Sequence, residues 1–235
     1  MRILVKFPSR GRPEKLKQVL TKYVTMAINP SNMVFMVTLD SNDSTVTMEL
    51  IDSLIAIHPN ISVRVGISGT KVKAINRDME YAPFFDILLL ASDDMIPELY
   101  GYDEIIKNHM HKFYPDTDGV LWFNDGKRGK ELNTLSILGK KYYDRFGYIY
   151  HPAYKSFYCD NEFMDIANRL GKQTYIDTVI IRHVHVTQDP SLDDDTYRIN
   201  TIFADEDKQL YLDRKVTNGA LSFLKHVKFP LKRIL

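Results

Sequence analysis

The sequence predicts an α/β protein with a mixed, mostly parallel central sheet that is flanked by helices in a single domain. Over roughly the first ninety residues, short apolar runs alternate with amphipathic stretches, which is typical of strand–helix–strand units. The run Ile87–Leu90 is continuously apolar. Such a run indicates a strand that is covered on both faces, as strands of a parallel sheet are.

The first half of the chain contains four expected strands separated by helices. The strands are expected over residues 3–7, 33–39, 61–65 and 87–90. Pro13 suits the first position of a helix, and Thr70 can cap another one. A helix between them presents Leu50, Leu54 and Ile57. Pro97 is expected to stop the last of these strands.

The second half is less regular. Asp103 is expected to cap a helix that continues past Ile106. Further strands are expected over residues 120–123, 135–138 and 175–181, and helices over residues 140–146 and 160–170. Residues 193–195 are expected to open a polar helical tail.

Composition restricts the class of protein. The chain has 235 residues, 44% of them apolar, and a net charge of +1, so no nucleic-acid binding is expected. The single Cys159 excludes an internal disulfide, suits a reducing compartment and is expected to pack rather than react. Since no apolar run approaches membrane-spanning length, we expect a cytoplasmic protein.

Asp93 and Asp94 directly follow the expected central strand. Open α/β sheets bind ligands at the carboxyl ends of their strands. A cation would relieve the repulsion between two neighbouring carboxylates, and such oxygen ligands suit Mg²⁺ or Mn²⁺. A helix cap or a solvated turn is the alternative interpretation of the pair.

Two other stretches could reach the same edge of the sheet. Backbone amides of Pro8-Ser9-Arg10, together with Asp40 after the second strand, could hold a base and a ribose, although ordinary turns would have similar sequences. Lys73 and Asn76 share one helical face near a helix start, which favours phosphate. Surface Lys and Asn side chains that only contact water are the alternative.

The order of these motifs resembles that of GT-A glycosyltransferases, in particular the family-2-like inverting enzymes. The matching stretches are residues 8–13, Asp40, residues 69–76, Ser92-Asp93-Asp94, Asp160-Asn161-Glu162 and His183-Val184-His185. The resemblance spans roughly residues 3 to 190 and implies a GT-A-like, Rossmann-like fold.

The resemblance also implies roles for particular residues. The donor nucleotide would contact Pro8, Ser9, Arg10, Asp40, Gly69, Lys73, Asn76 and Asp93. Asp94 would bind Mn²⁺ or Mg²⁺, and Asp93 would face the ribose or share the metal. The family's base lies in an acidic motif that opens a helix, and this role falls to Asp160, with Glu162 as the alternative.

The two histidines lie at a strand end, where alternate side chains point to opposite faces. Only one of them can easily reach the metal, and His185 is favoured over His183. Acceptor-side candidates are Trp122, Asn124, Asp125, Tyr150 and His151, with core packing as the alternative for Trp122.

We therefore expect a metal-dependent glycosyltransferase that moves a sugar from a nucleotide-diphosphate sugar to a saccharide or other hydroxyl acceptor, with inversion. A sugar nucleotidyltransferase and a noncatalytic nucleotide- or carbohydrate-binding module are the alternatives. Residues 1–97 would form the nucleotide-binding half of the catalytic domain and residues 98–190 the acceptor half. Residues 191–235 would form a helical tail packed on the domain, and its basic and apolar residues 221–233 could contact an anionic membrane surface.

Overall fold

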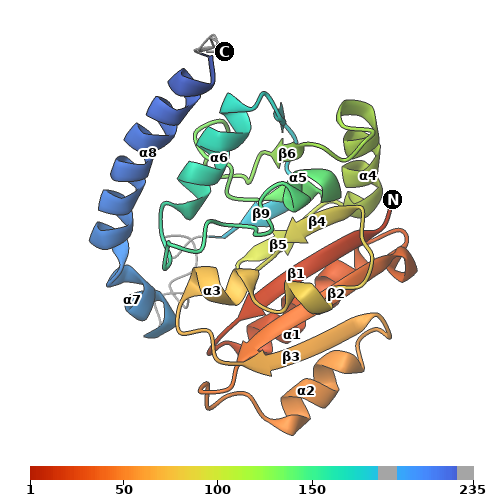
Figure 1. Cartoon of the computed structure of the whole chain (residues 1–235). Coiled ribbons are helices and arrows are strands. Elements are labelled where there is room, and N and C mark those ends of the chain that lie inside the picture. The colour runs from red at the N-terminus through yellow and green to blue at the C-terminus, as the bar shows by residue number, and fades with distance from the viewer. Residues whose placement is uncertain (185–194, 227–235) are drawn as a thin grey trace, which may run out of the picture.

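A seven-stranded sheet forms the centre of the computed structural model, which describes residues 1–184 and 195–226 (Figure 1). This sheet contains β1 (Ile3–Ser9), β2 (Met33–Asp40), β3 (Ile61–Gly66), β4 (Ile87–Leu90), β6 (Val120–Phe123), β7 (Ile137–Gly139) and β8 (Gln173–Ile176), while β5 (Met95–Pro97) and β9 (Ile181–His183) form a separate two-stranded sheet. The order across the sheet is β3-β2-β1-β4-β7-β6-β8. Within the seven-stranded sheet only the pairings of β7 are antiparallel, so the predicted mixed, mostly parallel sheet is confirmed.

Helices cover both faces of this sheet. They are α1 (Pro13–Thr25), α2 (Met48–Ile55), α3 (Lys71–Asn76), α4 (Tyr102–Phe113), α5 (Lys140–Asp144), α6 (Cys159–Arg169), α7 (Asp195–Thr201) and α8 (Ala204–His226), with 3-10 turns at Pro30–Asn32 and Met79–Tyr81. Apolar residues of α1, α2 and α4 pack on one face, and those of α3, α5 and α6 pack on the other. The two cores follow from alternation along β1, where Val5 faces the first core and Leu4 the second.

Lys6 interrupts this apolar alternation, because it is fully buried on the α3 side of β1. Its ammonium donates to the Thr38 hydroxyl and, at 2.6 Å, to the carbonyl oxygen of Arg77. Burial lowers the pKa of Lys6 to about 8. The lysine thus joins β1 and β2 to the turn that follows α3.

Several expected element ends are wrong for identifiable reasons. Asp103 does not cap α4, since that helix starts after Gly101 and the buried Asp103 carboxylate accepts the backbone amides of Ile28 and Asn29. The helix expected over residues 160–170 begins one residue earlier, at Cys159, and Tyr158 occupies its N-cap position.

The strand expected over residues 175–181 is two strands in different sheets. β8 pairs with β6 in the large sheet, whereas β9 pairs antiparallel with β5. Asp177 lies between them and accepts hydrogen bonds from Asn124 and Tyr175. This break turns β9 towards the segment that follows β4.

The helix α8 runs along α6 (Figure 1). Arg214 of α8 binds both carboxylate oxygens of Glu162 at 2.7 Å. The buried carboxylate of Asp207 accepts backbone amides just before α6, and the rings of Tyr211 and Tyr158 stack. The expected start of the tail at residues 193–195 is described only at Asp195, where α7 begins.

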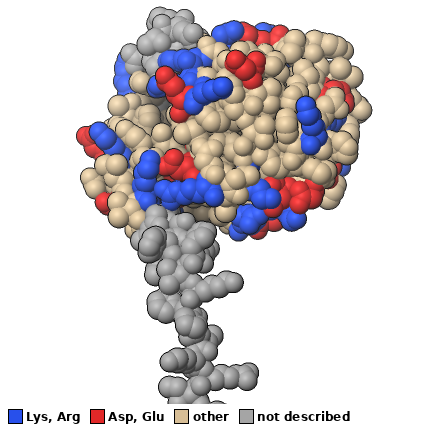
Figure 2. All heavy atoms as spheres, turned by 90° about the horizontal axis from the view of Figure 1, so that it is seen from above, with Lys and Arg blue, Asp and Glu red and all other residues tan. Residues whose placement is uncertain are grey.

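Charges of both signs are interspersed on the face seen in Figure 2, with uncharged surface between them. This distribution accords with the balanced composition of the chain. No helix in the described residues is both long and apolar enough to cross a bilayer.

We predict that Arg214→Ala lowers the free energy of unfolding by about 2 kcal/mol, because the buried Glu162 carboxylate then lacks its counter-charge. Urea denaturation of the two proteins measures this difference. Lys140→Ala is the matched control, since Lys140 pairs with Asp144 at the surface and exposed pairs contribute little. Equal losses in both variants would contradict the prediction.

The same pair predicts a pH dependence. Burial would raise the pKa of Glu162, but hydrogen bonds from Arg214 and Tyr154 outweigh it and hold that pKa below its usual value. The stabilisation is therefore complete above the unfolded-state pKa of about 4.3 and is lost as the pH falls through the folded-state pKa. The difference between wild type and Arg214→Ala should accordingly shrink in acid.

Candidate functional site

Three neighbouring parallel strands end at one edge of the sheet with polar side chains. β1 lies between β2 and β4, and these strands end near Ser9, Asp40 and Asp93 respectively. Ser9 Oγ donates to Asp93 Oδ2 at 2.8 Å, although the two residues are far apart in the sequence. The structure therefore brings together the sequence motifs that follow strands β1 and β4.

Both carboxylate oxygens of Asp93 have partners within the protein. Oδ2 accepts the hydrogen bond from Ser9, and Oδ1 lies 2.9 Å from the guanidinium of Arg12. Asp93 is only 5% exposed. It is thus held by β1 and by the residue that precedes α1, rather than facing open solvent.

Asp94 contacts a different set of residues. One oxygen accepts the hydroxyl of Ser92, and Oδ2 lies 3.5 Å from Nε2 of His183. The pairing of β5 with β9 produces this contact, because Met95 is opposite His183 and the Val184 amide donates to the Asp94 carbonyl oxygen. Of the two expected histidines, His183 is therefore beside Asp94, while His185 lies outside the described residues.

The two adjacent carboxylates differ in acidity. Burial and the negative charge of Asp94 raise the pKa of Asp93, against the opposing effects of Arg12 and Ser9. Burial would also raise the pKa of Asp94, but His183 and Ser92 hold it well below its usual value. Asp94 is therefore the more acidic member of the pair.

Asp40 anchors a second polar group at the end of β2. Its oxygens accept the Arg10 guanidinium at 2.8 Å and the Ser68 amide at 3.0 Å, and Arg77 Nη1 lies 3.5 Å away. Two buried atoms beside it, Ser68 Oγ and Arg77 Nη1, have no hydrogen-bond partner among the described residues. Pro8 lies within β1, where it pairs with Thr38.

The polar residues in and next to helix α3 differ in their contacts and exposure. Gly69 adopts a positive φ of 75° just before the Thr70 cap. The Asn76 side chain binds the backbone of Ile149 and Tyr150, so it has a structural role. Lys73 is exposed and lines a groove between α3 and residues 152–155.

The two expected base candidates have different environments. Glu162 is 3% exposed and is occupied by Arg214 and Tyr154. Asp160 is half-buried in the first turn of α6. Burial raises the pKa of Asp160, and the nearby charges of Lys71 and His183 oppose this rise. Asp160 is the more available proton acceptor of the two.

The acceptor-side candidates do not form one site. The Asp125 carboxylate accepts three backbone amides of its own loop and the Thr134 hydroxyl, and it lies 4.0 Å from His183 Nδ1. Asn124 binds Asp177. Trp122 is buried against Tyr175, and its indole nitrogen has no partner among the described residues.

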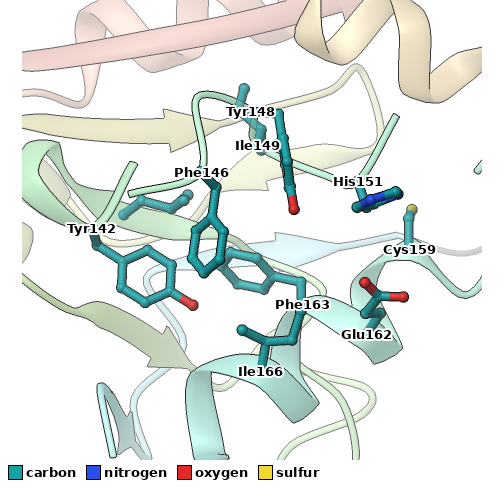
Figure 3. A pocket seen from close by; sticks show the side chains of 10 residues that line it. Tyr142, Phe146, Tyr148, Ile149, His151, Cys159, Glu162, Phe163 and Ile166 are labelled. Carbon is teal, nitrogen blue, oxygen red and sulfur yellow. The ribbon is translucent and has the colours of Figure 1, made fainter. Parts of the chain in front are cut away.

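His151 lines a small aromatic cavity (Figure 3), and Tyr150 contacts the ring of Phe163, which also lines this cavity. Tyr142, Phe146, Tyr148 and Phe163 surround it, and Glu162, Cys159 and His151 lie at its margin. Its volume is about 20 Å³, which leaves room for roughly one water molecule. The cavity is therefore too small for a sugar.

Asp94 Oδ2 and His183 Nε2 face each other as two possible metal donors. No group of three or more His, Cys, Asp and Glu side chains suited to a metal ion occurs in residues 1–184 and 195–226. The described donors thus fit part of a divalent-cation site, and substrate oxygens and water commonly supply further ligands of such ions.

Comparison with known proteins identifies the fold. No protein-family model and no curated protein sequence matches the chain. Among solved structures, it is similar to the mannosyltransferase PcManGT from Pyrobaculum calidifontis in complex with GDP-Man and Mn²⁺. The TM-score is 0.60 at 12% identity, over 78% of this chain and 56% of that one.

Two structures of S. aureus TarS are also similar. TarS has a TM-score of 0.62 at 14% identity, over 91% of this chain and 43% of that one. TarS 1-349 in complex with UDP-GlcNAc has a TM-score of 0.63 at 16% identity, over 88% and 66%. The chain spans about half the length of PcManGT and of TarS. It shares the mixed α/β fold of these proteins, which is the GT-A-like fold expected from the sequence.

Sequence reasoning missed two cations of the site. Arg12 pairs with Asp93, and Lys71 acts electrostatically on Asp94 and Asp160. Both lie in stretches that resemble GT-A glycosyltransferases, close to residues that the sequence predicts to bind the donor. Their own signal is weak, because a single basic residue in a turn or at a helix start is common.

We predict that Arg12→Met lowers the free energy of unfolding by about 3 kcal/mol, because it leaves the buried Asp93 without its ion pair. In the double variant Arg12→Met/Asp93→Asn, part of this loss should be recovered, since no buried charge remains. Urea denaturation of the wild type, both single variants and the double variant measures the coupling. Additive losses would show that the two side chains do not depend on each other.

Proposed function

We propose that the chain is a metal-dependent glycosyltransferase that moves a sugar from a nucleotide-diphosphate sugar to an acceptor hydroxyl, with inversion. The observation that carries the proposal is the contact of Asp94 with His183 at the carboxyl edge of the sheet. Asp160 lies within the electrostatic influence of the same histidine. The likeness in fold to proteins solved with GDP-Man and UDP-GlcNAc supports the donor class.

The donor's base and ribose would lie near Asp40. Ser68 Oγ and Arg77 Nη1 have no hydrogen-bond partner among the described residues, and Arg10 is nearby, so this group would offer both donors and an acceptor to a heterocycle. Asp93 is occupied by Arg12 and Ser9. We therefore assign it a positioning role rather than a share of the metal.

Asp94 and His183 would hold the Mn²⁺ or Mg²⁺ ion, and His185 remains a further candidate ligand. When bound, the ion would neutralise charge on the diphosphate leaving group. Asp94 suits this role because it stays anionic, with His183 and Ser92 stabilising its charge.

Asp160 would act as the base. As the acceptor oxygen attacks the anomeric carbon, the hydroxyl proton passes to the Asp160 carboxylate. The bond from the anomeric carbon to the diphosphate oxygen breaks, and its electrons leave with the nucleotide diphosphate. Attack from the opposite side inverts the anomeric configuration.

The class of acceptor and the membrane contact of residues 221–233 stay predictions. A saccharide is one class of acceptor that this reaction admits. A contact of residues 221–233 with an anionic membrane surface would place the enzyme at a membrane from the cytoplasmic side. Sedimentation with vesicles of anionic and neutral lipid tests that contact, and equal binding to both would argue against it.

We predict that Mn²⁺ strengthens binding of uridine or guanosine diphosphate at least about tenfold, and that Asp94→Ala removes this effect, because the ion loses an anionic ligand. Calorimetry with and without Mn²⁺ measures it. His183→Ala should reduce the effect less than Asp94→Ala does, since it removes a neutral ligand.

Asp40→Asn is the matched comparison in this titration. It should weaken nucleotide binding equally with and without Mn²⁺. The reason is that Asp40 is proposed to contact the nucleobase of the donor and not the metal ion. An undiminished metal effect in Asp94→Ala would remove Asp94 from the metal site.

We predict that Asp160→Asn slows sugar transfer at least about a hundredfold, because the variant cannot accept the acceptor proton. Folding and nucleotide binding should persist, since Asn is nearly isosteric with Asp. Release of free nucleotide diphosphate from a panel of nucleotide sugars with Mn²⁺ and candidate acceptors measures the rate. Glu162→Gln should act mainly on stability, because Glu162 is paired with Arg214.

The same panel separates the alternatives. A sugar nucleotidyltransferase would consume nucleotide sugar only in the presence of pyrophosphate and would yield nucleoside triphosphate. A noncatalytic module would bind ligand without turnover. Full activity of Asp160→Asn would require a different base.

A further inference from the structure

A groove of about 510 Å³ lies between α3 and the segment that precedes α6. Thr70, Lys73 and Arg77 line it from α3 and its flanking residues, and Pro152, Ala153 and Lys155 line the other side. This volume lies within the usual range for small-molecule sites. It is far larger than the aromatic cavity beside Glu162.

The groove is cationic. Lys73, Arg77 and Lys155 are among its lining residues, and no Asp or Glu is. The exposed Lys73 makes no ion pair with a carboxylate in the described part of the chain, whereas Lys155 pairs with Glu206 at 2.7 Å. The guanidinium of Arg77 is directed to Asp40, Asp78 and the Leu39 carbonyl oxygen. The lysines therefore supply the accessible positive charge.

Both walls of the groove are fixed in place. The Val72 amide donates to the Lys155 carbonyl oxygen at 3.0 Å, which ties α3 to the opposite wall. The buried carboxylate of Asp207 accepts the amides of Lys155, Ser156 and Phe157. The groove is thus preformed and does not depend on a ligand for its shape.

The groove is also connected to the proposed reaction centre. The segment that forms one wall continues directly into α6, which carries Asp160 in its first turn. On the other wall, Lys71 precedes Val72 and acts on Asp160 and Asp94. Each wall of the groove is therefore linked by a short stretch of chain to a residue of the proposed reaction centre or to a charge that acts on it.

We infer that this groove binds the acceptor and that the acceptor carries a phosphate group. The inference rests on the proposed function. Two lysines act as point charges for a phosphate, and the exposed Pro152 and Ala153 offer apolar contact to the rest of the acceptor. An uncharged saccharide would leave the lysines without a role in recognition.

Glycerol 3-phosphate is a suitable probe, with glycerol as the uncharged control. Each is titrated into the isotope-labelled full chain while amide shifts are followed by NMR. Shifts at Thr70, Lys73, Ala153 and Lys155 are expected with the phosphate only. Lys155→Gln should weaken binding roughly fivefold, the size of one screened charge contact.

Glu206→Gln should act in the opposite direction. Glu206 competes with the ligand for Lys155 and is 61% exposed, so its replacement frees the lysine without disturbing the core. We expect binding to tighten by roughly twofold to fivefold. Lys141→Gln, which removes an exposed lysine that pairs with Asp116, should leave binding unchanged.

Nucleotide diphosphate binding, measured on the same proteins, separates the two proposals. This inference would be overturned if glycerol 3-phosphate did not shift the groove amides, or if it bound Lys155→Gln and Glu206→Gln with equal affinity, while nucleotide diphosphate binding was retained. If the protein does not bind nucleotide diphosphate but glycerol 3-phosphate still shifts the groove amides, the result would count against the proposed function alone. Groove shifts with opposite effects of the two variants would support the phosphate-bearing acceptor.

Discussion

Two adjacent carboxylates at the end of β4 repel each other, and the surrounding structure compensates this repulsion from several directions. Arg12 and Ser9 hold Asp93 from the β1 side, whereas His183 meets Asp94 across the pairing of β5 with β9. The small second sheet therefore matters to the site, since it carries His183 to the acidic edge. The compensation also divides the pair into a buried, occupied Asp93 and a more acidic Asp94 that can meet a ligand.

A second constraint is the buried Lys6 in β1. Burial of an ammonium is costly, and its lowered pKa reflects that cost. In return, Lys6 fixes the carbonyl oxygen of Arg77, and the Arg77 side chain reaches Asp40 and Leu39 at the end of β2. The proposed nucleobase position near Asp40 is thus stabilised from inside the sheet by Lys6. An apolar strand pattern does not predict a lysine at such a buried position.

The sequence predicts what depends on local pattern. Apolar runs and alternation locate β1 to β4 and place Asp93 and Asp94 at a strand end. Contacts between distant segments have no such signature, as the pairing of Arg214 with Glu162 illustrates. Likewise, residues 175–181 look like one strand locally, and only the competing partners β6 and β5 divide them.

The helix α8 connects these observations. By pairing with Glu162, Arg214 occupies one of the two acidic residues at the start of α6 and leaves Asp160 as the available carboxylate. Asp207 of the same helix holds the backbone from Lys155 to Phe157, which forms a wall of the cationic groove. The position of the proposed base and the shape of the proposed acceptor groove therefore depend on the same helix. A change that detached α8 would disturb both together, while the edge formed by Asp40 and Asp94 is built from other elements.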